Sequence, residues 1–440
     1  MKDVANPKAA FYTLGCKVNQ NETEALGALF KEHAYQVVDF EEVADVYIIN
    51  TCTVTHLGDR KSRQVIRRAI HNNPEALIVV TGCYAQTSPG EVEQISGVDL
   101  IIGTRDRARM VDLIQEHTKG KKTVTHVSNI LTANDFEELP VDRLINRTRA
   151  YLKIQEGCEQ FCTYCIIPYA RGPSRSRSIE NTLLEANKLA AAGFKEVILT
   201  GIHLGAYGKD LANKVDLAYL CKQLLEQTDI ERLRLGSIEP TEISDELISL
   251  MVENPRFCRD LHIPLQNGDD EILKQMNRPY TTKDFREIVK KIRDKVPDIG
   301  ISSDIMVGFP GEDEKNFANS LSFVQEMGFM GLHVFKYSPR KGTPASKFAR
   351  QVSSQEKEKR SKAMLELAEQ GFKAFATNYL GKTLDVLVET AWSQGGWEGH
   401  TDNFIRVVFS GEGEKGIIVP IKLKKLEKNY VQGEPNYSRN

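Results

Sequence analysis

Short β-rich apolar runs alternate with helical patterns along most of this chain, and this alternation restricts the possible folds more than any other feature. Near the N-terminus three apolar runs lie at 10–14, 46–49 and 76–80, with helical patterns between them at 23–31 and 58–71. Strands separated by helices pair in parallel and are covered on both faces. We therefore expect an α/β fold that begins with a doubly wound parallel sheet.

Each of these three runs ends at a cysteine, namely Cys16, Cys52 and Cys83. In doubly wound sheets, ligands bind beyond the carboxyl ends of the strands. Small apolar residues at tight turns are the alternative explanation for cysteines there. Because the three occupy equivalent positions, we interpret them as ligands of one group.

Six longer units follow. Their apolar runs lie at 151–156, 196–200, 232–235, 261–264, 299–306 and 332–336, and helical patterns lie between them at 182–192, 217–226 and 284–295. Such a series fits a closed or partly closed parallel barrel, whose active site lies at the carboxyl ends of the strands. The loop after Glu156 is therefore predicted at the barrel mouth.

The last part of the chain no longer alternates strands with helices. A charged helical stretch at 354–378 leads into β-rich runs at 384–389, 404–409 and 416–423. Gly-rich turns separate these runs, without room for crossover helices. This pattern predicts a small antiparallel β-barrel, which we expect to fold independently. With the polar stretch 132–149 as a linker, the predicted domains are 1–131, 150–375 and 376–440.

The charge balance, the hydropathy and the number of cysteines indicate where this protein acts and with what partners. Lys and Arg total 58 and Asp and Glu total 60, so a net charge of −2 neither announces nor excludes a nucleic-acid partner. No apolar run approaches the roughly 18–20 residues of a membrane span, and the first residues lack the apolar core of a signal peptide. We expect a cytoplasmic protein without a membrane partner, in which the eight cysteines serve metal or redox chemistry.

Three of those cysteines, Cys158, Cys162 and Cys165, follow the first barrel strand with C-x3-C-x2-C spacing. A compact loop of this kind can direct three thiolates at a 4Fe-4S cubane, which leaves one iron open to a ligand. A structural zinc site would need a fourth Cys or His nearby, and an odd number of cysteines does not suit disulfides. The remaining cysteines, Cys221 and Cys258, lie in apolar or strand-flanking patterns and are interpreted as packing thiols.

Beyond this loop, motifs along the whole chain resemble the radical S-adenosylmethionine (SAM) methylthiotransferase family, and within it the bacterial enzymes that act on N6-threonylcarbamoyladenosine in tRNA. Besides the cysteine loop, the motifs are TLGCKVNQ at 13–20, NTCTVT at 50–55, TGCYAQ at 81–86, RGPSRSR at 171–177, HIPLQ at 262–266 and DIMVGFPGE at 304–312. This resemblance implies an N-terminal cluster domain, a radical SAM barrel and a C-terminal TRAM RNA-binding barrel.

The resemblance also implies a reaction, in which S–CH₃ replaces the C2–H of a modified adenine beside the anticodon of tRNA. That C–H is not acidic enough for an ordinary base, so a radical has to abstract the hydrogen. By resemblance, the barrel cluster binds SAM and cleaves it with an electron from an external donor. The cluster on Cys16, Cys52 and Cys83 holds a sulfur atom, and each turnover uses two SAM.

Weaker candidates for cofactor binding come from the same comparison and from strand ends. Tyr164 matches the position that packs near the adenine of SAM in the superfamily. Gly308 and Gly311 end a barrel strand, where a glycine allows close approach to a ligand or simply a tight turn. Glu239 and Gln266 also follow strands and are candidates for binding the ribose or methionine of SAM, with capping of the next helix as the alternative.

Local basic features suggest how tRNA is bound. Five basic residues lie on one predicted helix, and three arginines follow the barrel cysteines. The helix carries Arg60, Lys61, Arg63, Arg67 and Arg68, and the second set is Arg171, Arg175 and Arg177. Such guanidinium groups can bind phosphates or form a solvated face. In the C-terminal barrel, basic residues and aromatics suit single-stranded RNA, although the aromatics can equally fill the core. The set there is Lys422, Lys424, Lys425 and Lys428 with Trp392, Trp397 and Phe404.

Other functions share part of this pattern. Sister methylthiotransferases act on isopentenyladenosine in tRNA or on an aspartate of a ribosomal protein, and they share both cysteine triads. From a different class, a non-catalytic iron–sulfur electron carrier normally closes every iron with protein ligands, which neither triad here does. An RNA-binding scaffold would need no cysteines. We therefore expect an enzyme that acts on tRNA and not on DNA.

Overall fold

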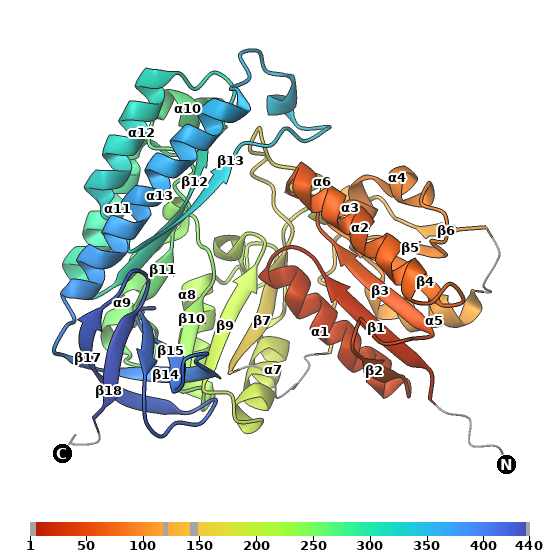
Figure 1. The fold of residues 1–440 in the computed structure, drawn as a ribbon, viewed down its shortest axis with the longest axis horizontal. Coiled ribbons are helices and arrows are strands. Elements are labelled where there is room, and N and C mark those ends of the chain that lie inside the picture. The colour runs from red at the N-terminus through yellow and green to blue at the C-terminus, as the bar shows by residue number, and fades with distance from the viewer. Residues whose placement is uncertain (1–5, 118–121, 141–147, 437–440) are drawn as a thin grey trace. The chain divides into compact units, whose positions relative to one another are not determined.

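The computed structural model, shown in Figure 1, describes residues 6–117, 122–140 and 148–436. The chain divides into two compact units, which interleave along the sequence. The first unit comprises Met1–Leu144, Gln155–Arg177 and Ser338–Ser346, and the second comprises Ile145–Ile154, Ser178–Tyr337 and Lys347–Asn440. The loop that carries Cys158, Cys162 and Cys165 therefore groups with the N-terminal part of the chain.

The first unit contains a six-stranded sheet in the order β2-β1-β3-β4-β5-β6, in which every neighbouring pair is parallel. This confirms the predicted doubly wound sheet. Its strands are β1 (Lys8–Thr13), β2 (Gln36–Val38), β3 (Val46–Thr51), β4 (Leu77–Gly82), β5 (Leu100–Ile102) and β6 (Val124–His126). Its helices are α1 (Lys17–Glu32), α2 (His56–Asn72), α3 (Cys83–Thr87), α4 (Pro89–Glu93), α5 (Met110–Glu116) and α6 (Ile167–Arg171), with 3-10 turns at Arg107–Arg109 and Ile130–Thr132.

Alternate residues of the central strand β3 point into two separate cores. Tyr47 and Ile49 pack against α2 and α4, whereas Ile48 packs with Phe30 of α1 and with α5. Every residue of β3 is buried, as expected of a parallel strand with helices on both faces. The two cores fix the sheet, and therefore fix the positions at which its strands end.

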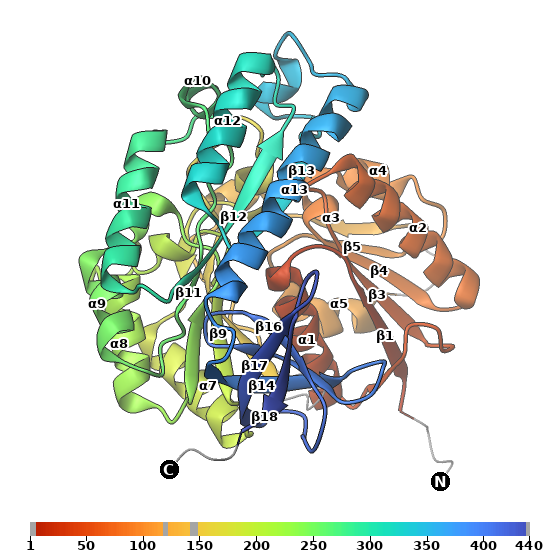
Figure 2. The same ribbon diagram turned by 60° about the vertical axis from the view of Figure 1, so that its left-hand side comes forward.

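The barrel strands, of which β8 and the end of β7 belong to the first unit, separate into two sheets rather than one closed cylinder. Figure 2 labels the strands β11, β12 and β13 of one of them. One sheet has the order β10-β9-β7-β8 and the other β11-β12-β13, with an isolated bridge between Ser237 and His262. This agrees with the predicted partial barrel. The strands are β7 (Arg149–Glu156), β8 (Arg175–Ser176), β9 (Glu196–Gly201), β10 (Arg232–Leu235), β11 (Asp260–His262), β12 (Gly300–Val307) and β13 (Gly331–Lys336).

Helices follow most of these strands, and most carry a side-chain cap at the N-terminus. In α11, for example, Thr281 and Asp284 form a reciprocal capping box. The helices are α7 (Ile179–Ala191), α8 (Leu217–Gln227), α9 (Asp245–Glu253), α10 (Asp270–Gln275), α11 (Thr282–Lys295), α12 (Glu314–Met327) and α13 (Ser354–Thr377), with 3-10 turns at Leu204–Ala206, Pro240–Glu242 and Pro344–Lys347. Within the described residues, no helix is long and apolar enough to cross a membrane.

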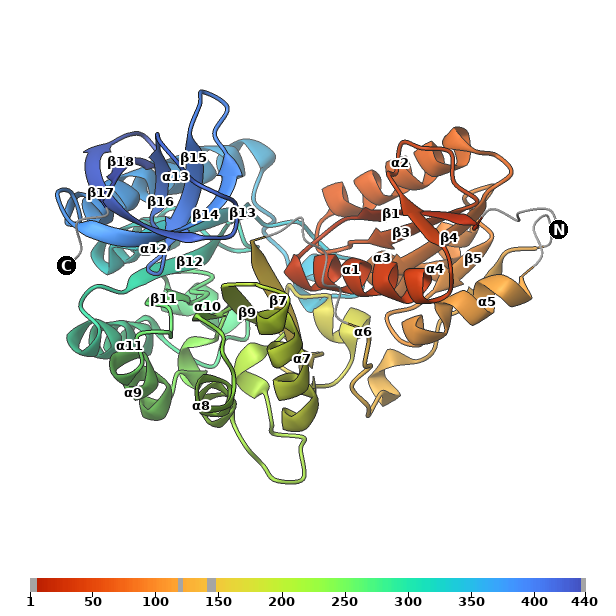
Figure 3. The same ribbon diagram turned by 90° about the horizontal axis from the view of Figure 1, so that it is seen from below.

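The C-terminal strands close into a five-stranded barrel in the order β14-β15-β16-β18-β17, seen at the upper left of Figure 3. Closure leaves no sheet edge open to further pairing. The strands are β14 (Thr383–Ala391), β15 (Trp397–Thr401), β16 (Arg406–Phe409), β17 (Ile418–Leu426) and β18 (Val431–Pro435). All neighbouring pairs are antiparallel except β16 and β18, which pair in parallel because β18 returns between β17 and β16.

Buried arginines join this barrel to the rest of the second unit. Arg234 of β10 binds Glu196 at 2.7 Å and Asp260 at 2.9 Å, and it also donates to the carbonyls of Thr401 and Asp402. The ring of Phe404 lies 4.8 Å from its guanidinium carbon. Removing the C-terminal barrel would expose this charged cluster, which argues against the expectation that the barrel is an independent unit.

Candidate functional site

The first group of candidate ligands lies at the carboxyl ends of three adjacent strands. Cys16 precedes α1, Cys52 follows β3, and Cys83 is the first residue of α3 directly after β4. Cys16 is exposed, whereas Cys52 and Cys83 are 8% and 4% exposed. The fold therefore brings together three thiols that are far apart in the sequence, at the sheet edge where such folds bind ligands.

Two observations show that the three thiols lie close together: the backbone beside Cys16, and the pKa shifts of Cys52 and Cys83. A Cβ on Gly15, whose φ is +113°, would lie 3.2 Å from the sulfur of Cys52, so only glycine fits before Cys16. Burial raises the pKa of Cys83 to about 12, and the neighbouring thiols Cys52 and Cys16 add to that rise. Burial likewise raises the pKa of Cys52, again with Cys16 nearby. The three sulfurs therefore share one site.

Arg171, which is fully buried, places a positive charge in this site. Its Nε donates to the sulfur of Cys83 at 3.3 Å, and its other nitrogens bind Glu22 and the Asn19 side chain, the latter at 2.6 Å. Burial would lower the pKa of Arg171, but Cys83, Glu156 and Glu22 together raise it well above its ordinary value. A fixed cation beside Cys83 favours the thiolate that an iron cluster needs as a ligand.

The carboxylate of Glu22 serves two arginines. It binds Arg171 and, at 2.6 Å, the buried Arg107, which also binds Glu137 at 2.8 Å. The sequence analysis missed Glu22, Asn19 and Arg107 and treated Arg171 as a phosphate ligand. For Asn19 and Glu22, the only local signal was a polar residue at a helix position that faces the core, since both are buried on α1.

The second group of candidate ligands lies on one short loop. The Cys158 N–H donates to the carbonyl of Gly172 and the Cys165 N–H to that of Cys162, both at 2.9 Å. Gly157 has a φ of +77°, and a Cβ there would lie 1.8 Å from the carbonyl oxygen of Pro173. The loop therefore turns tightly against 172–173, next to Arg171. Cys162 is buried, and Cys158 and Cys165 are half-buried.

One group of potential ligands is close enough together to bind a single ion. Among the residues that the structure describes, the one group with three ligand atoms all within 4.8 Å of one another is His262, Asp304 and His333. Neither cysteine triad is drawn together in that way. Because the thiolates of a cubane bind different irons, they lie farther apart than the ligands of one zinc ion. Sulfurs that do not meet within 4.8 Å are therefore compatible with a cubane, and the assignment of each triad to a cluster stays a prediction.

The remaining cofactor candidates have contacts of their own. Tyr164 is half-buried on the cysteine loop. Glu239 forms an ion pair with Arg278, and burial raises its pKa although Arg278 opposes the rise. The backbone of Gln266 bonds to the Asp304 carbonyl, at a φ of +64°. These contacts do not test binding of SAM, so the cofactor role of each residue stays a prediction.

The two glycines have a structural explanation. Gly308 has a φ of +73°, and a Cβ there would lie 2.3 Å from the side chain of Lys357. Its N–H donates to the carboxylate of Glu312, which Arg360 binds in turn. Gly311 has a φ of +88°, and its N–H donates to the Arg350 carbonyl. The turn alone therefore accounts for both glycines, and their role in binding SAM stays a prediction.

The predicted RNA contacts divide by exposure. Arg60 and Arg67 are exposed on α2, whereas the half-buried Arg63 donates to the hydroxyl of Tyr84. Arg175 and Arg177 are 4% and 5% exposed. Arg175 donates to the carbonyls of Pro173 and Arg171, and Arg177 binds Glu138 at 2.7 Å. Their burial and internal partners argue against phosphate binding by these two residues.

The C-terminal barrel divides in the same way. Lys424 is exposed and binds Glu434 at 2.8 Å. Trp397 packs on the barrel core, and Phe404 lies between Arg149 and Arg234. Trp392 is half-buried and contacts Tyr430. Core packing therefore accounts for Trp397 and Phe404. Cys221 and Cys258, interpreted as packing thiols, are 0% and 1% exposed.

Comparisons with known families agree with this geometry. The radical SAM superfamily matches residues 152–324 and the TRAM domain matches residues 377–435. Residues 8–103 match a family described as Uncharacterized protein family UPF0004. The protein is therefore a radical SAM enzyme with a TRAM domain, and the resemblance stated from the motifs is confirmed.

Full-length relatives define the class more narrowly: the chain belongs to the radical SAM tRNA methylthiotransferase family. It is 46% identical to threonylcarbamoyladenosine tRNA methylthiotransferase MtaB of Bacillus subtilis, over 97% of this chain and 95% of that protein. It is 37% identical to MtaB of Aquifex aeolicus, over 94% and 99% of the two chains. It is 35% identical to the tRNA-2-methylthio-N(6)-dimethylallyladenosine synthase of Pseudothermotoga lettingae, over 96% and 98%.

Solved structures support the fold alone. The radical SAM methyltransferase TsrM from Kitasatospora setae, with cobalamin and a [4Fe-4S] cluster bound, has a TM-score of 0.59 at 15% identity, and the match covers 78% of this chain and 77% of that one. The cobalamin-dependent radical enzyme OxsB has a TM-score of 0.51 over 83% of this chain and 56% of that one, also at 15% identity.

Proposed function

We propose that this enzyme converts N6-threonylcarbamoyladenosine beside the anticodon of tRNA to its 2-methylthio derivative, with two 4Fe-4S clusters and two SAM per turnover. When bound, these groups pass on the electron and supply the hydrogen-abstracting radical and the methylated sulfur. Cys158, Cys162 and Cys165 hold the first cluster, and Cys16, Cys52 and Cys83 hold the second. An external donor supplies the electrons, and the reaction takes place in the cytoplasm, where tRNA is the substrate.

The observation that carries this proposal is the second set of three converging thiols. Cleaving SAM requires only one cluster with an open iron, and the cysteine loop provides its ligands. The site of Cys16, Cys52 and Cys83 needs a separate purpose, and the buried cation of Arg171 suits it to anionic thiolates. A sulfur-transfer reaction accounts for a second cluster, whereas a reaction that only abstracts hydrogen does not.

Residues of the chain have distinct tasks in this proposal. Arg171 orients Cys83 through its Nε. The next residue, Gly172, accepts a hydrogen bond from the Cys158 N–H through its carbonyl. One short segment thus stabilises both sets of ligands. For tRNA, we propose that exposed cations bind phosphates while taking no part in the chemistry. They include Arg60 and Arg67 of α2 and Lys424 of the C-terminal barrel.

The choice of nucleoside rests on similarity. The chain is 46% identical to the Bacillus subtilis enzyme named for threonylcarbamoyladenosine and 35% identical to one named for dimethylallyladenosine. A base that carries a threonylcarbamoyl group also carries a carboxylate, which a dimethylallyl group lacks. The two substrates therefore demand different polar contacts at the active site.

Mass spectrometry of tRNA nucleosides from a deletion strain tests this proposal. We expect 2-methylthio-N6-threonylcarbamoyladenosine to disappear and its unmodified precursor to accumulate. The intact gene and a Cys221→Ala variant should restore the product, while Cys52→Ala should not. Loss of the dimethylallyl derivative instead would assign the sister specificity. No change in any nucleoside would favour an electron carrier or an RNA-binding scaffold.

A further inference from the structure

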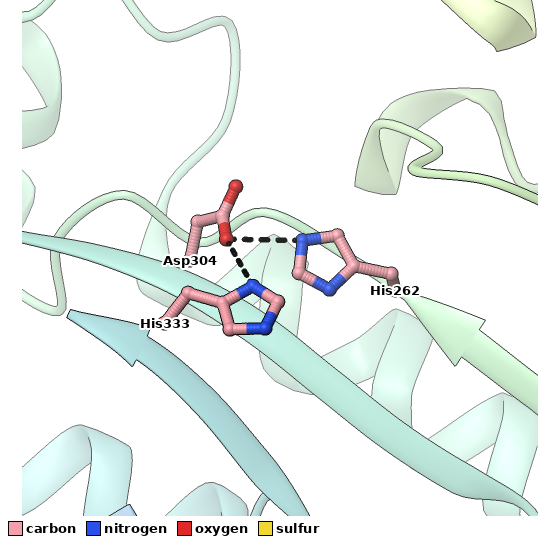
Figure 4. A group of neighbouring side chains, drawn as sticks. All are labelled: His262, Asp304 and His333. Carbon is pink, nitrogen blue, oxygen red and sulfur yellow. Dashed lines mark hydrogen bonds and ion pairs between the residues drawn. The ribbon is translucent and has the colours of Figure 1, made fainter. Parts of the chain in front are cut away.

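Three neighbouring strands of the second unit each bring one potential metal ligand to the same face. His262 ends β11, Asp304 lies within β12, and His333 lies on β13. Asp304 pairs directly with His333 across the sheet, and His262 pairs with Ser302, two residues before Asp304. Because residues two apart on a strand point to the same side, the three side chains meet on one face, as Figure 4 shows.

The donor atoms of these residues converge on one point. Oδ1 of Asp304 lies 3.1 Å from Nε2 of His262 and 3.1 Å from Nδ1 of His333. The two imidazole rings are stacked, with centroids 5.2 Å apart and an angle of 29° between their planes. Zinc binds imidazole nitrogen and carboxylate oxygen at about 2.0–2.2 Å, so tetrahedral ligands lie about 3.3–3.5 Å from one another. A small widening of the triad therefore accommodates an ion.

The orientation of His262 is fixed from behind. Its Nδ1 lies 3.0 Å from the hydroxyl oxygen of Ser302, which leaves Nε2 directed at Asp304. Histidine ligands of metals characteristically have their second ring nitrogen held by a hydrogen-bonding partner in this way.

The triad faces the more open side of its sheet. Along β12 the half-buried Ser302 and Asp304 alternate with the buried Ile301, Ser303 and Ile305. The side chain of His262 is 17% exposed, that of Asp304 24% and that of His333 68%. An ion could therefore reach the triad, and three protein ligands would leave one position open to water or to an oxygen of a bound molecule.

From these contacts we infer that His262, Asp304 and His333 form a site for one divalent first-row transition metal ion, for which Zn²⁺ is the probe. Nitrogen and oxygen donors suit such an ion, whereas the cysteine triads offer only sulfur. The inference does not depend on which nucleoside the enzyme modifies.

Equilibrium dialysis of the cluster-loaded holoenzyme against Zn²⁺, followed by elemental analysis for zinc and iron, tests this inference. We expect His333→Ala and Asp304→Asn to bind about one zinc per chain less than the unmodified enzyme, with equal iron. His71→Ala, which removes an exposed histidine at the end of α2, serves as the matched control and should retain the zinc. Equal zinc in all four proteins would overturn the inference.

X-ray absorption at the zinc edge of the same unmodified holoenzyme gives an independent result, because it requires no variant to fold. We expect a first shell of nitrogen and oxygen with the outer scattering of two imidazoles. A first shell of sulfur would place the zinc on cysteines and would overturn the inference whatever the dialysis shows.

Discussion

The two cysteine sites of the first unit are built in opposite ways. Cys158, Cys162 and Cys165 lie within one loop, whose turns are set by local hydrogen bonds and by Gly157. Cys16, Cys52 and Cys83 come from three strand ends, and the buried Arg171 at the end of α6, the helix after the other site's loop, binds one of them. The loop site depends mainly on local geometry, whereas the strand-end site depends on the whole sheet and on Arg171.

This difference predicts unequal sensitivity to substitutions at a distance. The loop should tolerate changes in the sheet, because its ligands are held within eight residues of chain. The strand-end site should fail when any of its supports fails, since each ligand arrives on a separate element. The largest effects are expected from removing the ligands themselves, and smaller ones from removing the groups behind them.

Removing the loop ligands should have the largest effect. We expect the variant Cys158→Ala, Cys162→Ala, Cys165→Ala to lose all formation of 5′-deoxyadenosine and to hold about four irons instead of about eight. Iron analysis after anaerobic reconstitution and product chromatography measure both. Cys221→Ala, a buried thiol outside the sites, serves as the control. A triple variant with unchanged iron would contradict the assignment of this loop.

Removing the strand-end ligands should separate the two tasks. The variant Cys16→Ala, Cys52→Ala, Cys83→Ala should no longer methylthiolate tRNA, yet it should still cleave SAM to 5′-deoxyadenosine, because the loop cluster suffices for that step. The two products are assayed side by side in one anaerobic reaction. Absence of 5′-deoxyadenosine despite four bound irons would refute this division of labour.

Arg171→Met should affect iron binding at the strand-end site more than at the loop site. The substitution leaves Glu22 and Glu156 buried without this cation, which costs about 3–5 kcal/mol of stability. Iron at the strand-end site should fall more than iron at the loop. To measure each site separately, Arg171→Met is combined with each triple cysteine variant in turn, so that only one site can bind iron. Arg234→Met in the second unit is the matched control, because it disrupts a buried ion cluster that contains no candidate cluster ligand. Equal loss of iron in both variants would mean that Arg171 acts only on general stability.

The control cluster also has its own pH signature. Burial would raise the pKa of Glu196, but Arg234, Arg149 and Arg232 lower it to about 2. Since the folded pKa is depressed, its stabilisation is present above the unfolded value near 4.5 and is lost as the pH falls toward 2. Denaturant unfolding at pH 6 and below pH 4.5 measures the free energy of unfolding. This free energy should depend less on pH for Glu196→Gln than for the unmodified protein. The exposed Glu246→Gln should leave the dependence unchanged.

Substitutions on the surface of α2 should have the smallest effect. Arg60→Ala with Arg67→Ala should weaken tRNA binding several-fold and reduce the slope of log affinity against log salt by about one to two. Filter binding at several salt concentrations measures both quantities. Arg286→Ala, a half-buried arginine that binds Glu326 in the second unit, is the control. An unchanged slope would remove α2 from the RNA surface.

Much of the fold was accessible from the sequence because its pattern is local. The runs at 196–200, 232–235 and 332–336 became β9, β10 and β13 within one residue at each end. The strands β15 and β18 went unrecognised, because their alternation is interrupted by Gly399 and Gly433. Parallel pairing of β16 and β18 has no local signal either, since it follows from how the barrel closes.

The sequence by itself determined the cysteine loop and the places at which the strand-end cysteines fall, because spacing along the chain and strand periodicity are local properties. Only the tertiary structure decided that Arg171 faces Cys83 rather than a phosphate, that Arg175 and Arg177 are buried, and that His262, Asp304 and His333 meet. Partners so distant in sequence are chosen by packing and sheet register. An arginine in a basic motif looks the same in a one-dimensional sequence whether its charge meets solvent, RNA or a buried carboxylate.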